Sequence, residues 1–224
     1  MNISAEPFYQ LPKMDWTEKL LANEAEICNE LLSHLKEDFT PKKPEEWAST
    51  YSHYSQTESN EKKPWKTFDL QFFGIKHLEN CAKFPFTSRL LSEIPELITA
   101  HFSLLHPKTI VQPHVGYSKM LLRNHLPLIV PEKGDMGIKV KDEVRCWKKG
   151  ELLSFNDGFI HEAWNLSDEI RVVLLFDVAH PQCGYSAKEI CAYKINNLED
   201  DFLLGIADKN TWRKWLHQGF FSMD

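Results

Sequence analysis

Five side chains suited to metal and anion chemistry gather in the second half of the chain: His114, Arg123, His125, His161 and Arg171. Imidazole is a ligand for iron, zinc, copper and nickel, and two histidines on neighbouring strands of a small barrel can point at one site in its mouth. Arg171 precedes the apolar run Val172–Phe176, where an unpaired guanidinium is costly to bury, so it needs an anion. That anion is either a structural carboxylate or the carboxylate of a small molecule. Spacing alone leaves open whether the histidines bind a metal or are hydrogen-bonded surface or core residues.

Short runs rich in Val, Ile, Leu and Phe predict β-strands around these side chains. They are Thr99–Leu105, Met120–Val130, Gly137–Val140, Val144–Trp147, Glu151–Phe155 and Ile170–Val178. Turn sequences separate the runs, including Asn156-Asp157-Gly158, in which we expect Asp157 to be a structural turn residue. Several short strands at this spacing favour a sandwich or barrel, jelly rolls included.

Helices are expected on both sides of the strands. Apolar residues recur every three or four positions between Leu20 and Leu35, which predicts one helix with a buried face. Shorter helices are expected near Thr87–Pro95 and Lys209–Leu216.

The segment of residues 40–65 is polar and loop-like. A stretch of this length is typical of either a disordered segment or an active-site cover. If it covers a site, Tyr51, Tyr54 and Trp65 are the side chains expected to reach it.

The overall composition indicates one folded domain. The chain has 224 residues, of which 42% are hydrophobic and 26% charged, a balance that excludes a disordered or fibrous chain. Its longest apolar runs are far shorter than the roughly 20 residues that span a bilayer, so no membrane association is expected. The net charge of −6 disfavours nucleic acid as a partner, because phosphate binding relies on clustered Lys and Arg.

Cysteine usage and the amino terminus predict a cytoplasmic location. The five cysteines show no CxxC pair, which is typical of reduced thiols. The first residues lack the basic start and apolar stretch of a secretory signal. The oligomeric state stays open.

A series of motifs in the same order and spacing resembles the aspartyl/asparaginyl β-hydroxylase family. They are His101–Thr109, Gln112–Gly116, Arg123–Leu126, Phe155–Asn165, Arg171 and Asp177–Pro181, together covering roughly residues 98–182. Members of that family are iron(II)- and 2-oxoglutarate-dependent oxygenases that use dioxygen. The resemblance implies a mainly β fold with flanking helices, namely a double-stranded β-helix of the jelly-roll or cupin-like kind.

The resemblance and the strand pattern together suggest a single domain over residues 1–224. We expect a helical and loop region over residues 1–97 that packs on the barrel, a double-stranded β-helix core over residues 98–182 and a C-terminal extension over residues 183–224.

The resemblance also assigns roles by position. His114 and His161 match the two iron ligands, and with Arg123 they are the expected catalytic residues. Ser103 and Arg171 match the pair that holds the distal carboxylate of 2-oxoglutarate, which suits a guanidinium and a hydroxyl. Arg123 and His125 match residues near the other end of this co-substrate and the oxygen-binding face.

Gly116 stands where most non-haem iron oxygenases have a metal-binding carboxylate, two positions after the first histidine. The resembled hydroxylases share this glycine, and water is expected in the vacant coordination position. The charges agree, because iron(II) carries +2 and 2-oxoglutarate carries −2. Chloride in the same position would give a halogenase, which remains an alternative.

One position departs from the animal enzymes of the family. They carry an arginine two residues before the position of Arg123, where it helps to grip the substrate carboxylate, whereas this chain has Leu121. Their large amino-terminal anchor and helical-repeat region also has no counterpart here, so folded growth-factor-like domains are not the expected substrates. We expect hydroxylation of an unactivated carbon in an amino acid, a peptide or a related small metabolite. A cupin-like protein that binds a metal or ligand without turnover is the alternative from another class.

Overall fold

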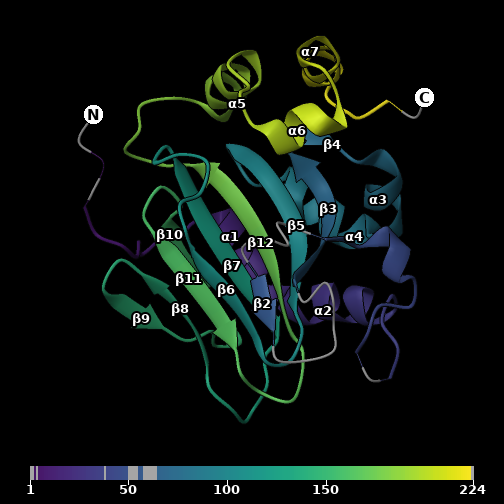
Figure 1. Ribbon diagram of the computed structural model, residues 1–224, viewed down its shortest axis with the longest axis vertical. Helices are drawn as coiled ribbons and strands as arrows, with labels where there is room; N and C mark the ends of the chain where they lie inside the picture. Colours follow the sequence, from purple (N-terminus) through teal and green to yellow (C-terminus); the bar gives the residue numbers. More distant parts are fainter. Residues whose placement is uncertain (1–2, 4, 38, 50–54, 58–64, 223–224) are drawn as a thin grey trace.

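Two antiparallel β-sheets face each other in the computed structural model, which describes residues 3, 5–37, 39–49, 55–57 and 65–222 (Figure 1). The larger sheet has the order β1 (Ala48–Ser49), β3 (Trp65–Phe72), β5 (Leu97–Leu105), β12 (Arg171–Ala179), β7 (Leu121–Ile129) and β10 (Leu153–Asn156), with β4 (Ile75–Lys76) paired to β3. The smaller sheet has the order β2 (Ser55–Thr57), β6 (Thr109–His114), β11 (His161–Asn165), β8 (Met136–Val140) and β9 (Glu143–Arg145). This is the mainly β, jelly-roll-like architecture that the sequence predicted.

Helices cover the outer face of the larger sheet. They are α1 (Asp15–Ala22), α2 (Glu24–Leu32), α3 (Leu78–Lys83) and α4 (Pro85–Ser92), with a 3₁₀ turn, η1, at Pro44–Glu46. Ile27 and Leu31 of α2 belong to the same buried cluster as Phe102, Leu174 and Phe176 of the sheet. Figure 1 shows α1 and α2 behind the strands in this view.

Alternation along β12 separates the helix-facing side of the larger sheet from the side that faces the smaller one. Leu174 and Phe176 lie in the cluster under the helices, whereas Val173 and Leu175 lie in a second cluster between the sheets. Side chains two residues apart share a face of a strand. Arg171 and Asp177 therefore point into the space between the sheets, in line with Val173 and Leu175.

Three helices after residue 183 cover one end of the sheets: α5 (Ala187–Asn196), α6 (Asp201–Ile206) and α7 (Lys209–Gln218). Figure 1 shows them together at the top of the molecule, above the ends of β3, β5 and β12. Ile190, Leu203 and Trp212 from these helices share a buried cluster with Leu121, at the first position of β7. Leu121 is therefore part of the surface on which the C-terminal helices pack.

The expected strands all have a counterpart, with shifts at their ends. The expected core boundary at residue 98 falls too late, because β1, β2 and β3 precede it and belong to the two sheets. The described part of the segment 40–65 pairs with both sheets, through β1 on β3 and β2 on β6. Tyr51 and Tyr54 lie outside the described residues.

The predicted helix from Leu20 to Leu35 is two helices instead. Asn23 interrupts it with non-helical dihedral angles (φ −109°, ψ 14°). Its side-chain amide donates a 2.7 Å hydrogen bond to the main-chain oxygen of Lys19. Asparagine side chains compete in this way with the helical backbone, which explains the break.

In the described part of the chain, no helix has both the length and the apolar character needed to cross a membrane. All five cysteines are free of disulfide bonds, and Cys183 and Cys191 are buried under the C-terminal helices.

Candidate active site

His114 and His161 lie side by side on adjacent strands of the smaller sheet. They are direct partners in the register between β6 and β11, and their ring centroids are 4.2 Å apart. The strand pairing, rather than a loop, thus brings together the two residues expected to bind iron.

Main-chain carbonyl groups orient both rings in the same way. Nδ1 of His114 lies 2.8 Å from the oxygen of Gln112, and Nδ1 of His161 lies 2.8 Å from the oxygen of Phe159. A carbonyl can only accept, so each Nδ1 carries the hydrogen and each Nε2 carries a lone pair. Fixing the tautomer through the second ring nitrogen is the usual arrangement of metal-binding histidines.

Burial keeps both rings neutral, the form that a metal requires. Desolvation, assisted by the neighbouring His114 and Arg123, lowers the pKa of His161 to about 3. Desolvation also lowers the pKa of His114, against the opposing effect of its hydrogen bond to Gln112.

The carboxylate of Asp157 occupies the space beside Gly116. A Cβ atom placed on Gly116 would lie 2.0 Å from Asp157 Oδ2, so glycine is required by this close approach. Oδ2 of Asp157 accepts a 2.8 Å hydrogen bond from the amide of Tyr117, and the Asp157 side chain is fully buried. Asp157 does more than form a turn, because it supports the strand end that carries His114.

Arg123 is held by two buried carboxylates. Its Nε and Nη2 atoms each donate a 2.9 Å hydrogen bond to Asp177, and its Nη1 lies 2.5 Å from Asp157 Oδ1. Burial by itself would lower the pKa of Arg123, but Asp157 and Asp177 outweigh burial and hold it above its ordinary value. The guanidinium is a fixed cation beside His114.

Arg171 lacks such a partner. Its side chain is 3% exposed, and Nη1 donates a 3.1 Å hydrogen bond to the main-chain oxygen of Ser103. Nε of Arg171 is buried without a hydrogen-bond partner, and no carboxylate among the described residues pairs with the guanidinium. Desolvation lowers the pKa of Arg171 to about 9. A buried cation of this kind is unfavourable unless an anion binds to it.

Two tryptophans complete the surroundings of Arg171. The indole of Trp65 donates a 3.1 Å hydrogen bond to Ser103 Oγ, so the Ser103 hydroxyl can still donate its own hydrogen to a ligand. The indole of Trp147 donates a 3.0 Å bond to Nδ1 of His125, and its ring lies 4.5 Å below the Arg171 guanidinium.

His125 is a second buried donor without a partner. Because its Nδ1 accepts from Trp147, the hydrogen of this neutral ring is on Nε2, and Nε2 is buried with no hydrogen-bond partner. The pKa of His125 lies well below its ordinary value. Desolvation is the largest cause, and the positive charges of Arg171 and Arg123 also lower it.

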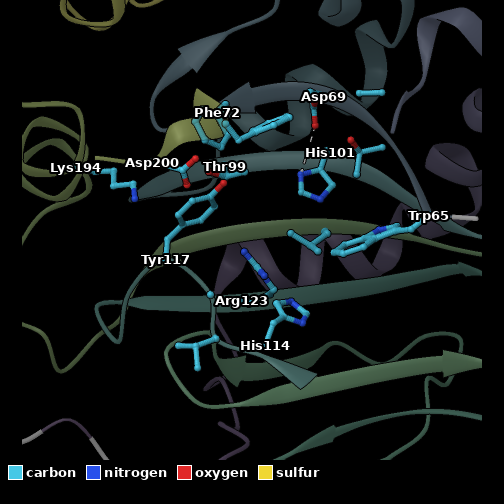
Figure 2. A pocket seen from close by; sticks show the side chains of 16 residues that line it. Trp65, Asp69, Phe72, Thr99, His101, His114, Tyr117, Arg123, Lys194 and Asp200 are labelled. Carbon is cyan, nitrogen blue, oxygen red and sulfur yellow. Dashed lines mark ion pairs between the residues drawn. The ribbon is translucent and has the colours of Figure 1, made fainter. Parts of the chain in front are cut away.

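A cavity of about 370 Å³ reaches this region from the surface (Figure 2). Figure 2 shows Arg123 and His114 in the middle, Trp65 at one end, and Tyr117, Lys194 and Asp200 at the other. The four other expected site residues lie behind this lining and are buried: Ser103, His125, His161 and Arg171.

A further ionisable pair lies across the cavity from His114. Nδ1 of His101 is 3.8 Å from Asp69 Oδ1, on neighbouring strands β5 and β3. Desolvation lowers the pKa of His101 to about 3, assisted by Arg123, and raises the pKa of Asp69 to about 6.

The residues present fit iron(II) and 2-oxoglutarate. Two neutral imidazoles with fixed tautomers suit the metal, although no group of three or more His, Cys, Asp or Glu residues in the described regions could hold one. The unpaired guanidinium of Arg171 and the orphaned Nε2 hydrogen of His125 suit an anion with carboxylate groups.

A family model described as aspartyl/asparaginyl beta-hydroxylase matches residues 22–181. The chain belongs to this family. The match begins before the motifs at residues 98–182 and includes β3 and the helices α2, α3 and α4 that cover the larger sheet.

Individual relatives share less than half of their length with the chain. An ornithine lipid ester-linked acyl 2-hydroxylase from Rhizobium tropici is 43% identical over 118 residues, which make up 52% of this chain and 42% of that protein. The human aspartyl/asparaginyl beta-hydroxylase is 35% identical over 127 residues, or 54% of this chain and 17% of that protein. The structure titled as a predicted oxalate decarboxylase from Thermotoga maritima overlaps weakly, with 13% identity and a TM-score of 0.36 over 59% of this chain and 97% of that chain.

Several site residues were not predicted from the sequence. Asp157 was expected only in a turn, and the roles of Asp177 and Trp147 were not anticipated. An acidic residue inside the apolar strand Arg171–Ala179 was the available signal for Asp177, because a buried carboxylate requires a partner.

Proposed function

We propose that this protein is an iron(II)- and 2-oxoglutarate-dependent oxygenase that hydroxylates an unactivated carbon of an amino acid, a peptide or a related small metabolite. The observation that supports it most is the juxtaposition of two facing neutral imidazoles with a buried guanidinium that no carboxylate in the described structure neutralises. Family membership and the names of the two relatives, both hydroxylases, support the same reaction class.

His114 and His161 would hold the metal through Nε2, with their hydrogen bonds to carbonyl groups keeping the lone pairs in place. Arg171 and the Ser103 hydroxyl would hold the distal carboxylate of 2-oxoglutarate. When bound, iron(II) and 2-oxoglutarate supply the oxidation of a C–H bond by dioxygen, with release of succinate and carbon dioxide. Ser103, His161 and Arg171 are buried, which limits the access of water to the reacting groups.

Arg123 and His125 would act at the other end of the co-substrate. Arg123 contributes a guanidinium of fixed position, because its ion pairs with Asp157 and Asp177 hold the side chain in place. His125 contributes an Nε2 hydrogen whose position Trp147 determines. Both groups are oriented before any ligand binds, which reduces the cost of ordering them.

Hydroxylation is favoured over halogenation by the contact between Gly116 and Asp157. The glycine in a halogenase leaves room for chloride, whereas here a carboxylate fills the space at Gly116. A halide there would have to displace that carboxylate from its ion pair with Arg123.

The test is oxygen-dependent conversion of 2-oxoglutarate to succinate by purified protein supplied with iron(II). Amino acids and peptides are then screened by mass spectrometry for a product heavier by one oxygen, in buffer that contains chloride. Succinate formation that requires iron supports the oxygenase, and its absence supports a binding protein without turnover. A chlorine isotope pattern in the main product would instead identify a halogenase.

A further inference from the structure

The end of the cavity opposite Trp65 is built largely by the C-terminal helices. Lys194 of α5, with Asp200 and Phe202 at the start of α6, lines the cavity together with Tyr117. Figure 2 shows Lys194, Asp200 and Tyr117 close together on the far side of Arg123 from Trp65. Residues 194–202 lie beyond the family match at residues 22–181, so the family match does not describe this wall.

Lys194 is a half-buried cation with no ion-pair partner among the described residues. Its Nζ lies 4.6 Å from the centre of the Tyr117 ring, which holds the ammonium group against the cavity wall. Burial lowers the pKa of Lys194, and the charge of Asp200 opposes that shift. A lysine fixed in this way can bind an anion that enters the cavity.

Asp200 provides the opposite charge without neutralising Lys194 directly. Its Oδ1 accepts a 3.1 Å hydrogen bond from the amide of Leu203 and caps α6. Asp200 forms no salt bridge within the described part of the chain. A cation and an anion that line one end of a cavity, near each other but not paired, match a ligand that carries both charges.

The apolar residues around this pair leave room for a side chain or an acyl group. Phe72 and Tyr117 lie with ring centroids 5.9 Å apart, and both line the cavity. Phe202 lines it as well and is 52% exposed. This combination of two charges and aromatic walls is typical of small-molecule sites.

Leu121, the position at which the sequence departs from the animal enzymes, packs in the same buried cluster as the helix that carries Lys194. Leu121 is fully buried, in one cluster with Ile190 and Cys191 of α5. An arginine at position 121 would be buried in that apolar cluster. The helix that packs over Leu121 also carries Lys194, and so supplies a cation to the cavity from a different element.

We propose that Lys194 and Asp200 form the substrate head-group subsite, Lys194 binding a carboxylate and Asp200 an ammonium group, so that the substrate is a zwitterion of the amino-acid type. The assignment rests on the proposed function, in which 2-oxoglutarate binds near Trp65 and Arg171. The opposite end of the cavity is then left for the substrate. Binding at the subsite itself needs no turnover.

The experiment measures binding of the twenty free L-amino acids by calorimetry, each beside its N-acetyl and carboxamide derivatives. It is carried out on the metal-free protein and on protein with iron(II) and 2-oxoglutarate in the absence of oxygen. We expect at least one free amino acid to bind, and its two blocked derivatives to bind at least tenfold more weakly. Failure of every free amino acid to bind, or equal binding of the blocked forms, overturns the proposal.

Two variants separate the roles of the charges. Lys194→Met keeps the length of the side chain and should weaken the free amino acid at least tenfold while leaving the carboxamide unchanged. Asp200→Asn keeps a residue that can cap the helix. It should weaken binding of the free amino acid at least tenfold and leave binding of the N-acetyl derivative unchanged. Lys188→Met and Asp201→Asn, on the same two helices and exposed, are the matched controls. If Lys188→Met weakens amino-acid binding as much as Lys194→Met, or Asp201→Asn as much as Asp200→Asn, the assignment is overturned.

The outcomes for the reaction and for the subsite are independent. Succinate formation with no amino-acid binding leaves the oxygenase standing and removes the subsite. Amino-acid binding that depends on Lys194 and Asp200, without succinate formation, keeps the subsite and removes the oxygenase.

Discussion

Asp177 and Arg123 stand directly opposite each other on β12 and β7, and the carboxylate accepts two parallel hydrogen bonds of 2.9 Å from the guanidinium. Burial raises the pKa of Asp177, while Arg123 acts to lower it. The pair joins the neighbouring strands β12 and β7 of the larger sheet, and Arg123 lines the cavity at this point.

Loss of one partner from this pair should be strongly destabilising. Asp177→Asn leaves Arg123 buried with only Asp157, and breaking a buried pair costs about 3–5 kcal/mol. The measurement is the free energy of unfolding in denaturant. Asp168→Asn, which removes an exposed pair with Lys108, should change it by less than about 0.5 kcal/mol. Equal stabilities of the two variants would contradict the role given to Asp177.

Removal of either ring of the facing pair should abolish metal binding. We expect His114→Ala and His161→Ala to lose iron(II) binding in anaerobic equilibrium dialysis and to lose turnover, because Gly116 offers no replacement donor. The control is His217→Ala, an exposed residue of α7, which should bind iron(II) as the unmodified protein does. Full iron(II) binding by either His114→Ala or His161→Ala would refute the assignment.

Replacement of Arg171 should separate a ligand-binding role from a structural one. Arg171→Met removes a buried guanidinium that lacks a counter-ion, so the ligand-free protein should be at least as stable as the unmodified one. The dissociation constant for 2-oxoglutarate should rise at least tenfold, because loss of a buried charge-assisted contact costs about 2–5 kcal/mol. Calorimetric titration and thermal unfolding measure the two effects. Lower stability with unchanged 2-oxoglutarate affinity would show a structural role instead.

The space beside Gly116 should not tolerate even one methyl group. Gly116→Ala places a carbon 2.0 Å from the Asp157 carboxylate and should destabilise the protein by about 1–3 kcal/mol. Gly205→Ala is the matched control, since nothing lies within 4 Å of its added carbon and it lies within α6. Chemical denaturation checks both, and an unaffected Gly116→Ala variant would mean that Asp157 can move away.

His77 should make the protein sensitive to mild acid. Its ring stacks on Phe221 with centroids 4.1 Å apart, and burial lowers its pKa from 6.5 to about 4. The folded state resists protonation, so stability is retained above pH 6.5 and falls as the pH drops from 6.5 toward 4.

His77→Phe keeps the ring stack and removes this titration. Between pH 7.5 and 5, the unmodified protein should lose up to about 2 kcal/mol more stability than the variant. Urea unfolding at several pH values measures the difference, and parallel pH profiles would contradict it.

The central strands were predictable because they are buried on both faces. The runs that became β5, β7 and β12 are apolar over most of their length, so their strand character is strong. The strands that carry the two histidines gave a weak signal. β6 includes Gln112 and Pro113, and β11 includes Glu162, because the smaller sheet exposes part of its surface.

The partners of the site residues depended on register, which the sequence does not show. Arg123 could be expected in the site, but its capture by Asp177 follows from the alignment of β7 with β12. The Trp147 contact that orients His125 likewise depends on a loop after β9 that returns to the larger sheet. The interruption of the first helix at Asn23 depends on a local hydrogen bond that competes with apolar periodicity.

Under the proposed function, the direct pairing of His114 with His161 would connect metal availability to the folding equilibrium. The two proposed nitrogen ligands meet only when β6 and β11 are joined, so the unfolded chain would have no comparable site. A metal at a concentration of a hundred times its dissociation constant would add about 2.7 kcal/mol to the stability of the folded state. The smaller sheet would then open less often in iron-replete cells than in iron-starved ones, so that the lifetime of the protein against proteases would follow the iron supply.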